Sequence, residues 1–123
     1  MIDLRISDIR PFIPAQDFAL SKDFYVALGF ELAYSDANLA RLSSGSCSFY
    51  LQNYWIKDWA DNSMLHITVA DAGACHEQVA ALLATGRFPG ARVAPPKQEP
   101  YGARVTYVWD PTGVLLHLAE WTN

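Results

Sequence analysis

The same order of strands and helices is predicted twice along this chain of 123 residues. In the first half, a helix begins after the capping residue Asp17 and ends at Gly29, and in the second half a helix begins after Asp71 and ends at Gly86. One predicted strand precedes each helix and three follow it. The predicted strands cover 5–13, 30–35, 39–42 and 46–52 in the first half and 64–69, 91–94, 104–109 and 114–120 in the second. This repeat predicts that two copies of one unit pair and that their curved sheets form a shared concavity.

The two repeats fit within one domain. We expect an α+β fold in which two βαβββ modules, about 5–52 and 64–120, form a curved mixed sheet within a single domain spanning 1–123. Hydrophobic side chains make up 51% of the chain and charged ones 18%, which is typical of a compact domain. A chain of this length buries enough surface to fold without a disulfide or a structural metal.

Charge and hydropathy exclude several classes of partner. The formal net charge is −4 and the basic residues are scattered singly, so we expect no nucleic-acid partner. No apolar run approaches the roughly 20 residues of a membrane span. Cys47 and Cys75 lie far apart without metal-ligand spacing, and no signal peptide precedes the first predicted strand. We therefore expect a cytoplasmic protein whose two thiols are free and buried, with a disulfide between Cys47 and Cys75 as the alternative.

Two stretches between the predicted strands are irregular. Segment 53–63 contains Tyr54, Trp55 and Trp59, which either cover a sheet edge or a subunit contact, or line a ligand site. Segment 95–102 contains three prolines, which predict a rigid loop. Neither stretch marks a domain boundary.

Strand alternation places two histidines on the concave face. In the first strand of the second half, Leu65 and Ile67 share the face towards the helices, which leaves His66 on the other face. In the last strand the same alternation turns His117 away from the buried face and puts Glu120 on the side opposite His117. The two imidazoles could form half of a metal site, serve a structural role, or hydrogen-bond and stack in a cavity wall. We favour the cavity wall.

Several short motifs occur in an order shared with a known superfamily. They are Pro11–Asp17, Phe24-Tyr25, Leu28-Gly29-Phe30, Asp110-Pro111-Thr112-Gly113 and Leu115–Leu118. In order and spacing they resemble the glyoxalase, bleomycin resistance and ring-cleaving dioxygenase superfamily, also called the vicinal oxygen chelate superfamily. Asp61-Asn62 and the segment 99–102 resemble the bleomycin resistance proteins more narrowly. The resemblance extends over nearly the whole chain and implies the same two-module fold.

The resemblance also implies where a metal would bind in the metal-dependent members. Their ligands stand at positions that correspond here to Arg10, His66 and His117, with a fourth near Tyr50 or Gln52. A guanidinium stays protonated, cannot coordinate a metal and repels a cation beside it. We therefore expect this chain to bind no metal and to use no cofactor.

The resemblance to bleomycin resistance proteins implies a ligand groove. The positions expected to contact the ligand are Tyr34, Leu39, Trp55, His66, Tyr101 and His117. His66 stands where the characterised binders tend to have tryptophan, and Leu39 where they tend to have phenylalanine, so this groove is expected to be less aromatic. Asp36 and Asp61 are the acidic candidates for contact with a cationic ligand. In the family the groove forms between two copies of the chain, which implies a homodimer and is compatible with exchange of the N-terminal strand.

These features favour binding over catalysis. We expect the protein to bind and sequester a bleomycin-type glycopeptide antibiotic, or a similar planar cationic ligand, in a dimer cleft without catalysis. The first alternative is a metal-dependent glyoxalase-like lyase, isomerase or thiol transferase that uses His66 and His117. The second is a binding module for another planar metabolite.

Overall fold

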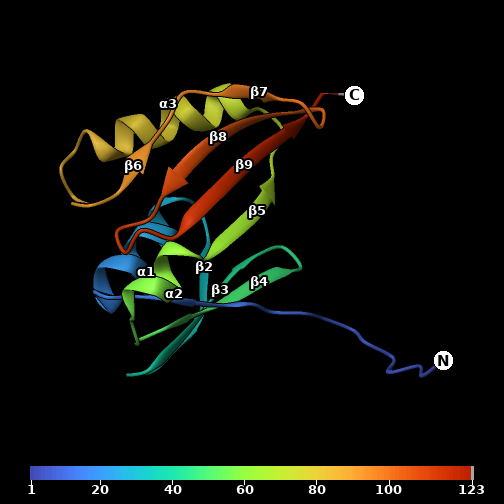
Figure 1. Ribbon diagram of the computed structural model, residues 1–123. Helices are drawn as coiled ribbons and strands as arrows, with labels where there is room; N and C mark the ends of the chain where they lie inside the picture. The colour runs from blue at the N-terminus through green and yellow to red at the C-terminus, as the bar shows by residue number, and fades with distance from the viewer. Residues whose placement is uncertain (123) are drawn as a thin grey trace.

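The computed structural model describes residues 1–122, and its first module consists of helix α1 and a four-stranded sheet, sheet A (Figure 1). The elements of this module are β1 (Phe12–Pro14), α1 (Phe18–Ala27), β2 (Glu31–Ser35), β3 (Leu39–Ser44) and β4 (Cys47–Gln52). The strand order is β1-β4-β3-β2, with β1 parallel to β4 and the other neighbours antiparallel. Asp17 caps α1 by accepting a hydrogen bond from the backbone N–H of Leu20. Gly29 follows the helix with a φ of 109°, a conformation that glycine adopts without strain.

The second module repeats this arrangement in sheet B. Its elements are β5 (Met64–Thr68), α3 (Ala72–Leu83), β6 (Arg92–Val93), β7 (Lys97–Glu99), β8 (Ala103–Trp109) and β9 (Leu115–Trp121), and the short helix α2 (Lys57–Asp61) precedes them. The strand order is β5-β9-β8-β6, and β7 pairs with β8. Asp71 caps α3 through the backbone N–H of Ala74. None of the helices within residues 1–122 combines the length and the apolar character that a membrane crossing requires.

One hydrophobic core joins the two modules. Phe24 and Tyr25 of α1 are fully buried, and Phe24 meets Phe88 of the second module edge to face, with ring centroids 5.3 Å apart. The Tyr25 hydroxyl donates a 2.7 Å hydrogen bond to Asp110, in the turn between β8 and β9. The predicted α+β fold of two βαβββ modules is confirmed, in the form of two mixed sheets.

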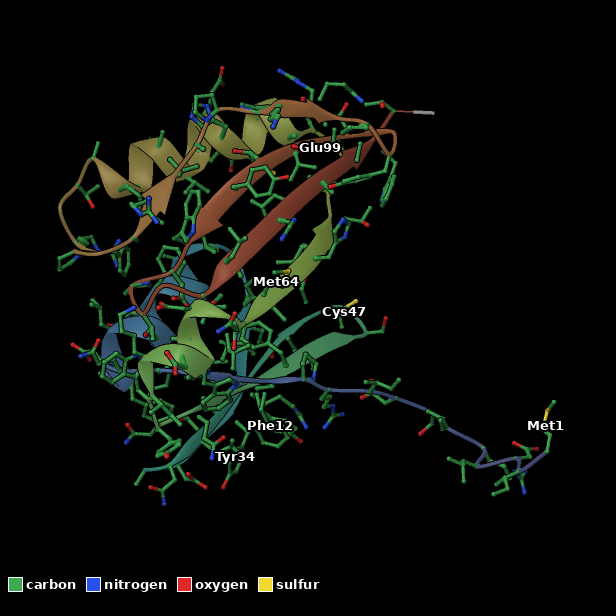
Figure 2. All side chains as sticks on the ribbon, in the orientation of Figure 1. Met1, Phe12, Tyr34, Cys47, Met64 and Glu99 are labelled. Atoms are coloured by element: carbon green, nitrogen blue, oxygen red, sulfur yellow. The ribbon has the colours of Figure 1, made fainter. Side chains whose placement is uncertain are left out.

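The prediction of a long first strand is wrong. Residues 1–10 form an extended arm that runs away from both sheets (Figure 1), and Met1 lies at its far end (Figure 2). Phe12 lies opposite Tyr50 in the parallel ladder, so residue 9 would lie opposite Cys47, where β4 begins. Earlier residues have no neighbouring strand in this chain, and strand structure requires one.

Four smaller predictions also need correction. Segment 53–63 contains the helix α2, and 95–102 contains β7, which forms because the prolines flank those three residues and do not interrupt them. Strand β3 extends through Ser44, two residues beyond its predicted end at residue 42. Cys47 and Cys75 are both free, but the thiol of Cys47 is exposed because this residue begins β4 beside the hairpin turn.

Candidate ligand-binding site

Three neighbouring strands bring two histidines and a tyrosine together on one face of sheet B. His66 of β5 and His117 of β9 are direct partners in the parallel ladder, and Tyr107 of β8 is the partner of His117 on its other side. The imidazole rings are stacked with centroids 5.8 Å apart. The Tyr107 ring meets His117 edge to face at 5.1 Å. The register of the sheet therefore builds a continuous row of rings.

Two further rings extend this row. The Trp121 ring lies 5.6 Å from His66, and Tyr101 lies 5.8 Å from Trp121. The Trp121 indole N–H donates to the Thr68 hydroxyl at 3.2 Å, which holds the ring in place. Both Tyr101 and Trp121 are about half exposed. We call the five residues His66, Tyr101, Tyr107, His117 and Trp121 the ring platform.

Buried polar atoms at the centre of the ring platform lack partners. Neither ring nitrogen of His117 has a hydrogen-bond partner among residues 1–122, although both are buried. Burial lowers the pKa of His117 from its ordinary value of 6.5, the charge of His66 lowers it further, and Glu99 opposes the change. The imidazole is therefore neutral at pH 7 and offers one N–H donor and one acceptor nitrogen. Buried polar groups are normally hydrogen-bonded, so these two nitrogens are free to pair with a ligand or with water.

Tyr107 is fixed beside these nitrogens by a carboxylate. Its hydroxyl donates a 3.0 Å hydrogen bond to Glu99 of β7. Burial, followed by this hydrogen bond, raises the pKa of Tyr107 to about 12. The phenol therefore stays protonated and holds one orientation against His117.

The face of sheet A carries a second group of polar and aromatic side chains. Phe12 and Tyr50 are stacked with ring centroids 4.9 Å apart. An Arg10 guanidinium N–H donates a 3.0 Å hydrogen bond to the Tyr50 hydroxyl. Arg41 of β3 lies between Tyr50 and Tyr34 in the ladder, as the register partner of both. This face combines aromatic rings with positive charge.

The two acids expected to meet a cationic ligand already have partners. Asp36 accepts the Tyr34 hydroxyl hydrogen bond at 2.6 Å, and its other carboxylate oxygen accepts two backbone N–H bonds at the start of β3. These bonds lower the pKa of Asp36, the bond from Tyr34 contributing most. Asp61 is paired with Lys57 one helical turn away. Neither carboxylate is an unpartnered anion.

The six predicted contact residues fall into three places. His66, Tyr101 and His117 are members of the ring platform on the second module. Tyr34 and Leu39 lie on sheet A (Figure 2 labels Tyr34), and Trp55 lies between β4 and α2. Sequence reasoning missed Tyr107, Trp121 and Arg41. Tyr107 could have been predicted from the sequence, because the alternation of side chains along β8 and the pairing of β8 with β9 place this ring beside His117.

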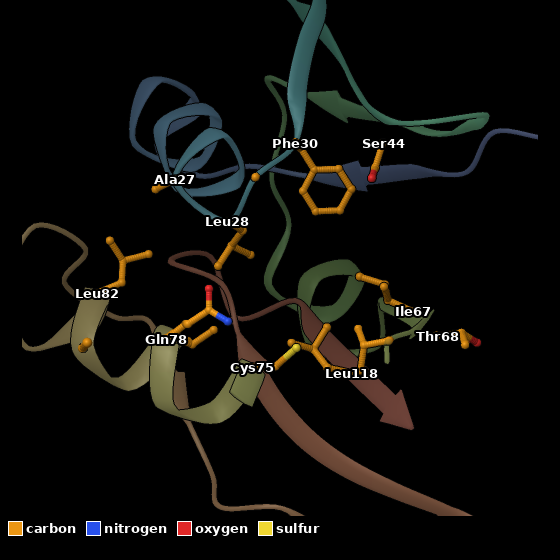
Figure 3. A pocket seen from close by; sticks show the side chains of 14 residues that line it. Ala27, Leu28, Phe30, Ser44, Ile67, Thr68, Cys75, Gln78, Leu82 and Leu118 are labelled. Atoms are coloured by element: carbon orange, nitrogen blue, oxygen red, sulfur yellow. The ribbon is translucent and has the colours of Figure 1, made fainter. Parts of the chain in front are cut away.

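A large cavity lies on the other side of sheet B. It has a volume of about 720 Å³ and separates the end of α1 from α3 (Figure 3). Most of its lining side chains are apolar, among them Leu28, Phe30, Ile67 and Leu118. Ile67 and Leu118 point away from the ring platform by strand alternation. Chemistry-bearing side chains are concentrated on the open face and not in this cavity.

A metal site of the kind implied for metal-dependent relatives does not fit these side chains. Arg10 and Tyr50, which the resemblance implies at or near two of the four ligand positions, are hydrogen-bonded to each other. His66 and His117 supply only two donors, and within residues 1–122 no three His, Cys, Asp or Glu side chains gather as a metal site would require. The side chains present are instead suited to stacking and hydrogen bonding.

Comparison with solved structures places this fold among known proteins. The bleomycin-binding protein from bleomycin-producing Streptomyces verticillus, complexed with copper(II)-bleomycin, is similar with a TM-score of 0.79 and 26% identity over 100% of this chain and 99% of that one. An antibiotic binding protein, TnmS3 from Streptomyces sp. CB03234, is similar with a TM-score of 0.79 and 21% identity over 98% of this chain and 100% of that one.

An enzyme with the same fold is also similar. The lactoylglutathione lyase from Agrobacterium tumefaciens gives a TM-score of 0.71 and 16% identity over 94% of each chain. No protein-family model and no curated protein matches this chain. The chain thus has the fold of the vicinal oxygen chelate superfamily predicted from its motifs, with bleomycin resistance proteins among its structural relatives.

Proposed function

We propose that this protein binds and sequesters a planar, antibiotic-like small molecule, such as a bleomycin-type glycopeptide, without changing it chemically. The ring platform with the unpartnered nitrogens of His117 at its centre carries this proposal. The similarity of the fold to two antibiotic-binding proteins also supports the proposal.

Stacking would supply most of the affinity. Each ring contact contributes about 0.5–1.5 kcal/mol beyond the area that it buries, so several rings together reach micromolar binding or better. His117 would add orientation, because its neutral ring offers one donor and one acceptor to a flat heterocycle. Tyr107 is already held by Glu99, so little side-chain freedom is lost there on binding.

The arrangement of nucleophiles favours binding over catalysis. Across residues 1–122 no serine or cysteine donates a hydrogen bond to a histidine, which is the contact that activates such a nucleophile. The two histidines instead stack on each other and on neighbouring rings.

A second copy of the chain would complete the site. The arm exposes Ile2, Leu4, Ile6 and Ile9 to solvent, and the open faces expose Phe12 together with rings of the platform. Exposed apolar area of this extent is typical of a subunit contact. We propose a homodimer in which each arm packs on its partner and each ring platform forms a cleft with the partner's sheet A.

Tryptophan fluorescence tests the binding site. Because Trp121 belongs to the ring platform, a bound bleomycin should quench the emission, and Trp121→Phe should lose most of that response. Tyr101→Ala should weaken binding by roughly 1–2 kcal/mol, the loss of one stacking face with its buried area.

Tyr54→Ala is the matched control, because Tyr54 is exposed to a similar degree and packs against Trp59 outside the platform. If Tyr101→Ala and Tyr54→Ala both bind as tightly as the parent, the ring platform is not the binding surface.

A further inference from the structure

Arg41 is a charged side chain without a counter-ion in the middle of sheet A. Its Nε lies buried without a hydrogen-bond partner, and the three ion pairs found within residues 1–122 do not include it. A buried N–H donor left unpaired is costly, because this N–H has lost contact with water without gaining an acceptor, although the Arg41 side chain as a whole is only partly buried.

A second guanidinium approaches the same phenol from the arm. Arg10 donates to the Tyr50 hydroxyl at 3.0 Å, while Arg41 is the register partner of Tyr50 on β3. The hydrogen bond from Arg10 is the largest cause of a lowered pKa at Tyr50, burial opposes it, and Arg41 adds to the lowering. Both cations therefore act on one phenol oxygen.

The positive charge of this group is only partly balanced. Asp8 pairs with Arg10 at 2.8 Å, and among residues 1–122 no other carboxylate forms an ion pair with either arginine. Asp8 and Arg10 line a shallow, open pocket, so a ligand can reach this part of the face of sheet A. Two guanidinium charges against one carboxylate leave this part of the face with an excess positive charge, which attracts an anion.

We propose that Arg10, Arg41 and Tyr50 form a subsite for an acidic oxygen group, and that planar aromatic acids are a second class of ligand for the proposed cleft beside the bleomycin-type one. This inference rests on the proposed function, which supplies the planar ligand. A guanidinium presents a planar set of N–H donors that matches a carboxylate or a similar oxyanion. Phe12, stacked on Tyr50 and half exposed, provides an apolar surface for the attached ring. Asp36 and Asp61 already have partners, so neither is a free carboxylate that would oppose an acidic ligand.

A matched pair of probes tests the subsite. The protein labelled with ¹⁵N is titrated with 2-naphthoate and with its neutral isostere 2-naphthamide, and the Nε–H signals of the arginines are followed by NMR. We expect the naphthoate to shift the signals of Arg10 and Arg41 saturably and the naphthamide to leave them in place. Arg41→Gln should weaken naphthoate binding about tenfold, the loss of one charge-assisted contact, without affecting naphthamide.

Control variants separate charge from folding. Arg87→Gln removes the same charge at an exposed position beside Phe88 and should leave naphthoate binding unchanged. Arg10→Gln repeats the test at a side chain outside the core, in case Arg41→Gln fails to fold.

The outcomes distinguish this inference from the proposed function. Equal affinity for the two probes, or an unshifted Arg41 signal with naphthoate bound, would overturn the acidic subsite while leaving planar binding intact. Arginine-dependent binding of naphthoate without any bleomycin binding would support the subsite and count against a bleomycin-type ligand. If no naphthoate binds at all, the subsite is overturned.

Discussion

At the scale of single residues, His117 has the most unusual surroundings in the described chain. Its ring is flanked by His66 and Tyr107, and both of its nitrogens are buried without partners. Burial therefore disfavours the imidazolium, and a second imidazole nearby adds to this effect.

The lowered pKa of His117 predicts a dependence of stability on pH. Because the folded-state pKa lies below the ordinary 6.5, the unfolded chain binds the proton more readily. The stability that the neutral His117 contributes to the folded state is complete above pH 6.5. It is lost as the pH falls below that value and through the lower folded-state pKa. Urea unfolding at about pH 7.5 and about pH 5.5 should show a smaller decrease in stability for His117→Gln than for the parent.

His76→Gln is the matched control, since it removes an imidazole from α3 outside the ring platform. If the decrease in stability between the two pH values is the same in His117→Gln as in the parent and in this control, the account of His117 is wrong.

At the scale of elements, two hydrogen bonds connect α1 to the turn between β8 and β9: one joins the Ser21 and Thr112 hydroxyls, and the fully buried one joins Tyr25 to Asp110. The Tyr25 hydroxyl donates to one oxygen of Asp110, and the other oxygen accepts the backbone N–H groups of residues 112, 113 and 114. The carboxylate thus fixes the turn and attaches it to the helix of the other module.

Tyr25→Phe should destabilise the protein by about 1–3 kcal/mol, because the buried Asp110 oxygen would lose its partner while the ring remains. The free energy of unfolding in urea measures the change. The control Tyr54→Phe removes a hydroxyl from an exposed ring and should stay within about 0.5 kcal/mol of the parent. Equal stability of the two variants would show that the bond contributes nothing.

Elements were predictable from the sequence where local chemistry decides them. Asp17 and Asp71 cap the two long helices, and alternation alone put His66 and His117 on one face, because these features depend on neighbours in sequence. The arm was not predictable, since its alternating apolar residues look like a strand whether or not a partner strand exists. The subsite around Arg41 was also hidden, because its partners are set by the register between strands.

At the scale of the whole molecule, the isolated chain leaves its arm and both ring-bearing faces uncovered. Ile2, Leu4 and Ile6 alternate with polar residues along the arm, so one side of it is apolar. An arm of this kind gains stability when it pairs with a second copy.

We expect a homodimer at micromolar concentration, measured by light scattering as about twice the chain mass of 13.7 kDa. Ile6→Asp should shift the protein towards the monomer, because it puts a charge on the apolar side of the arm. Ser7→Asp adds the same charge on the other side and should remain dimeric. A species of 13.7 kDa for the parent throughout this range would contradict the dimer.

The most direct test of sequestration is the fate of the ligand itself. The dimer is saturated with bleomycin, stoichiometry is measured by calorimetry, and the ligand is recovered and analysed by mass spectrometry. Two-fold symmetry gives each chain one equivalent cleft, so the account predicts one ligand per chain, recovered with unchanged mass. A modified product that accumulates beyond the amount of protein would show catalysis and would contradict the central claim.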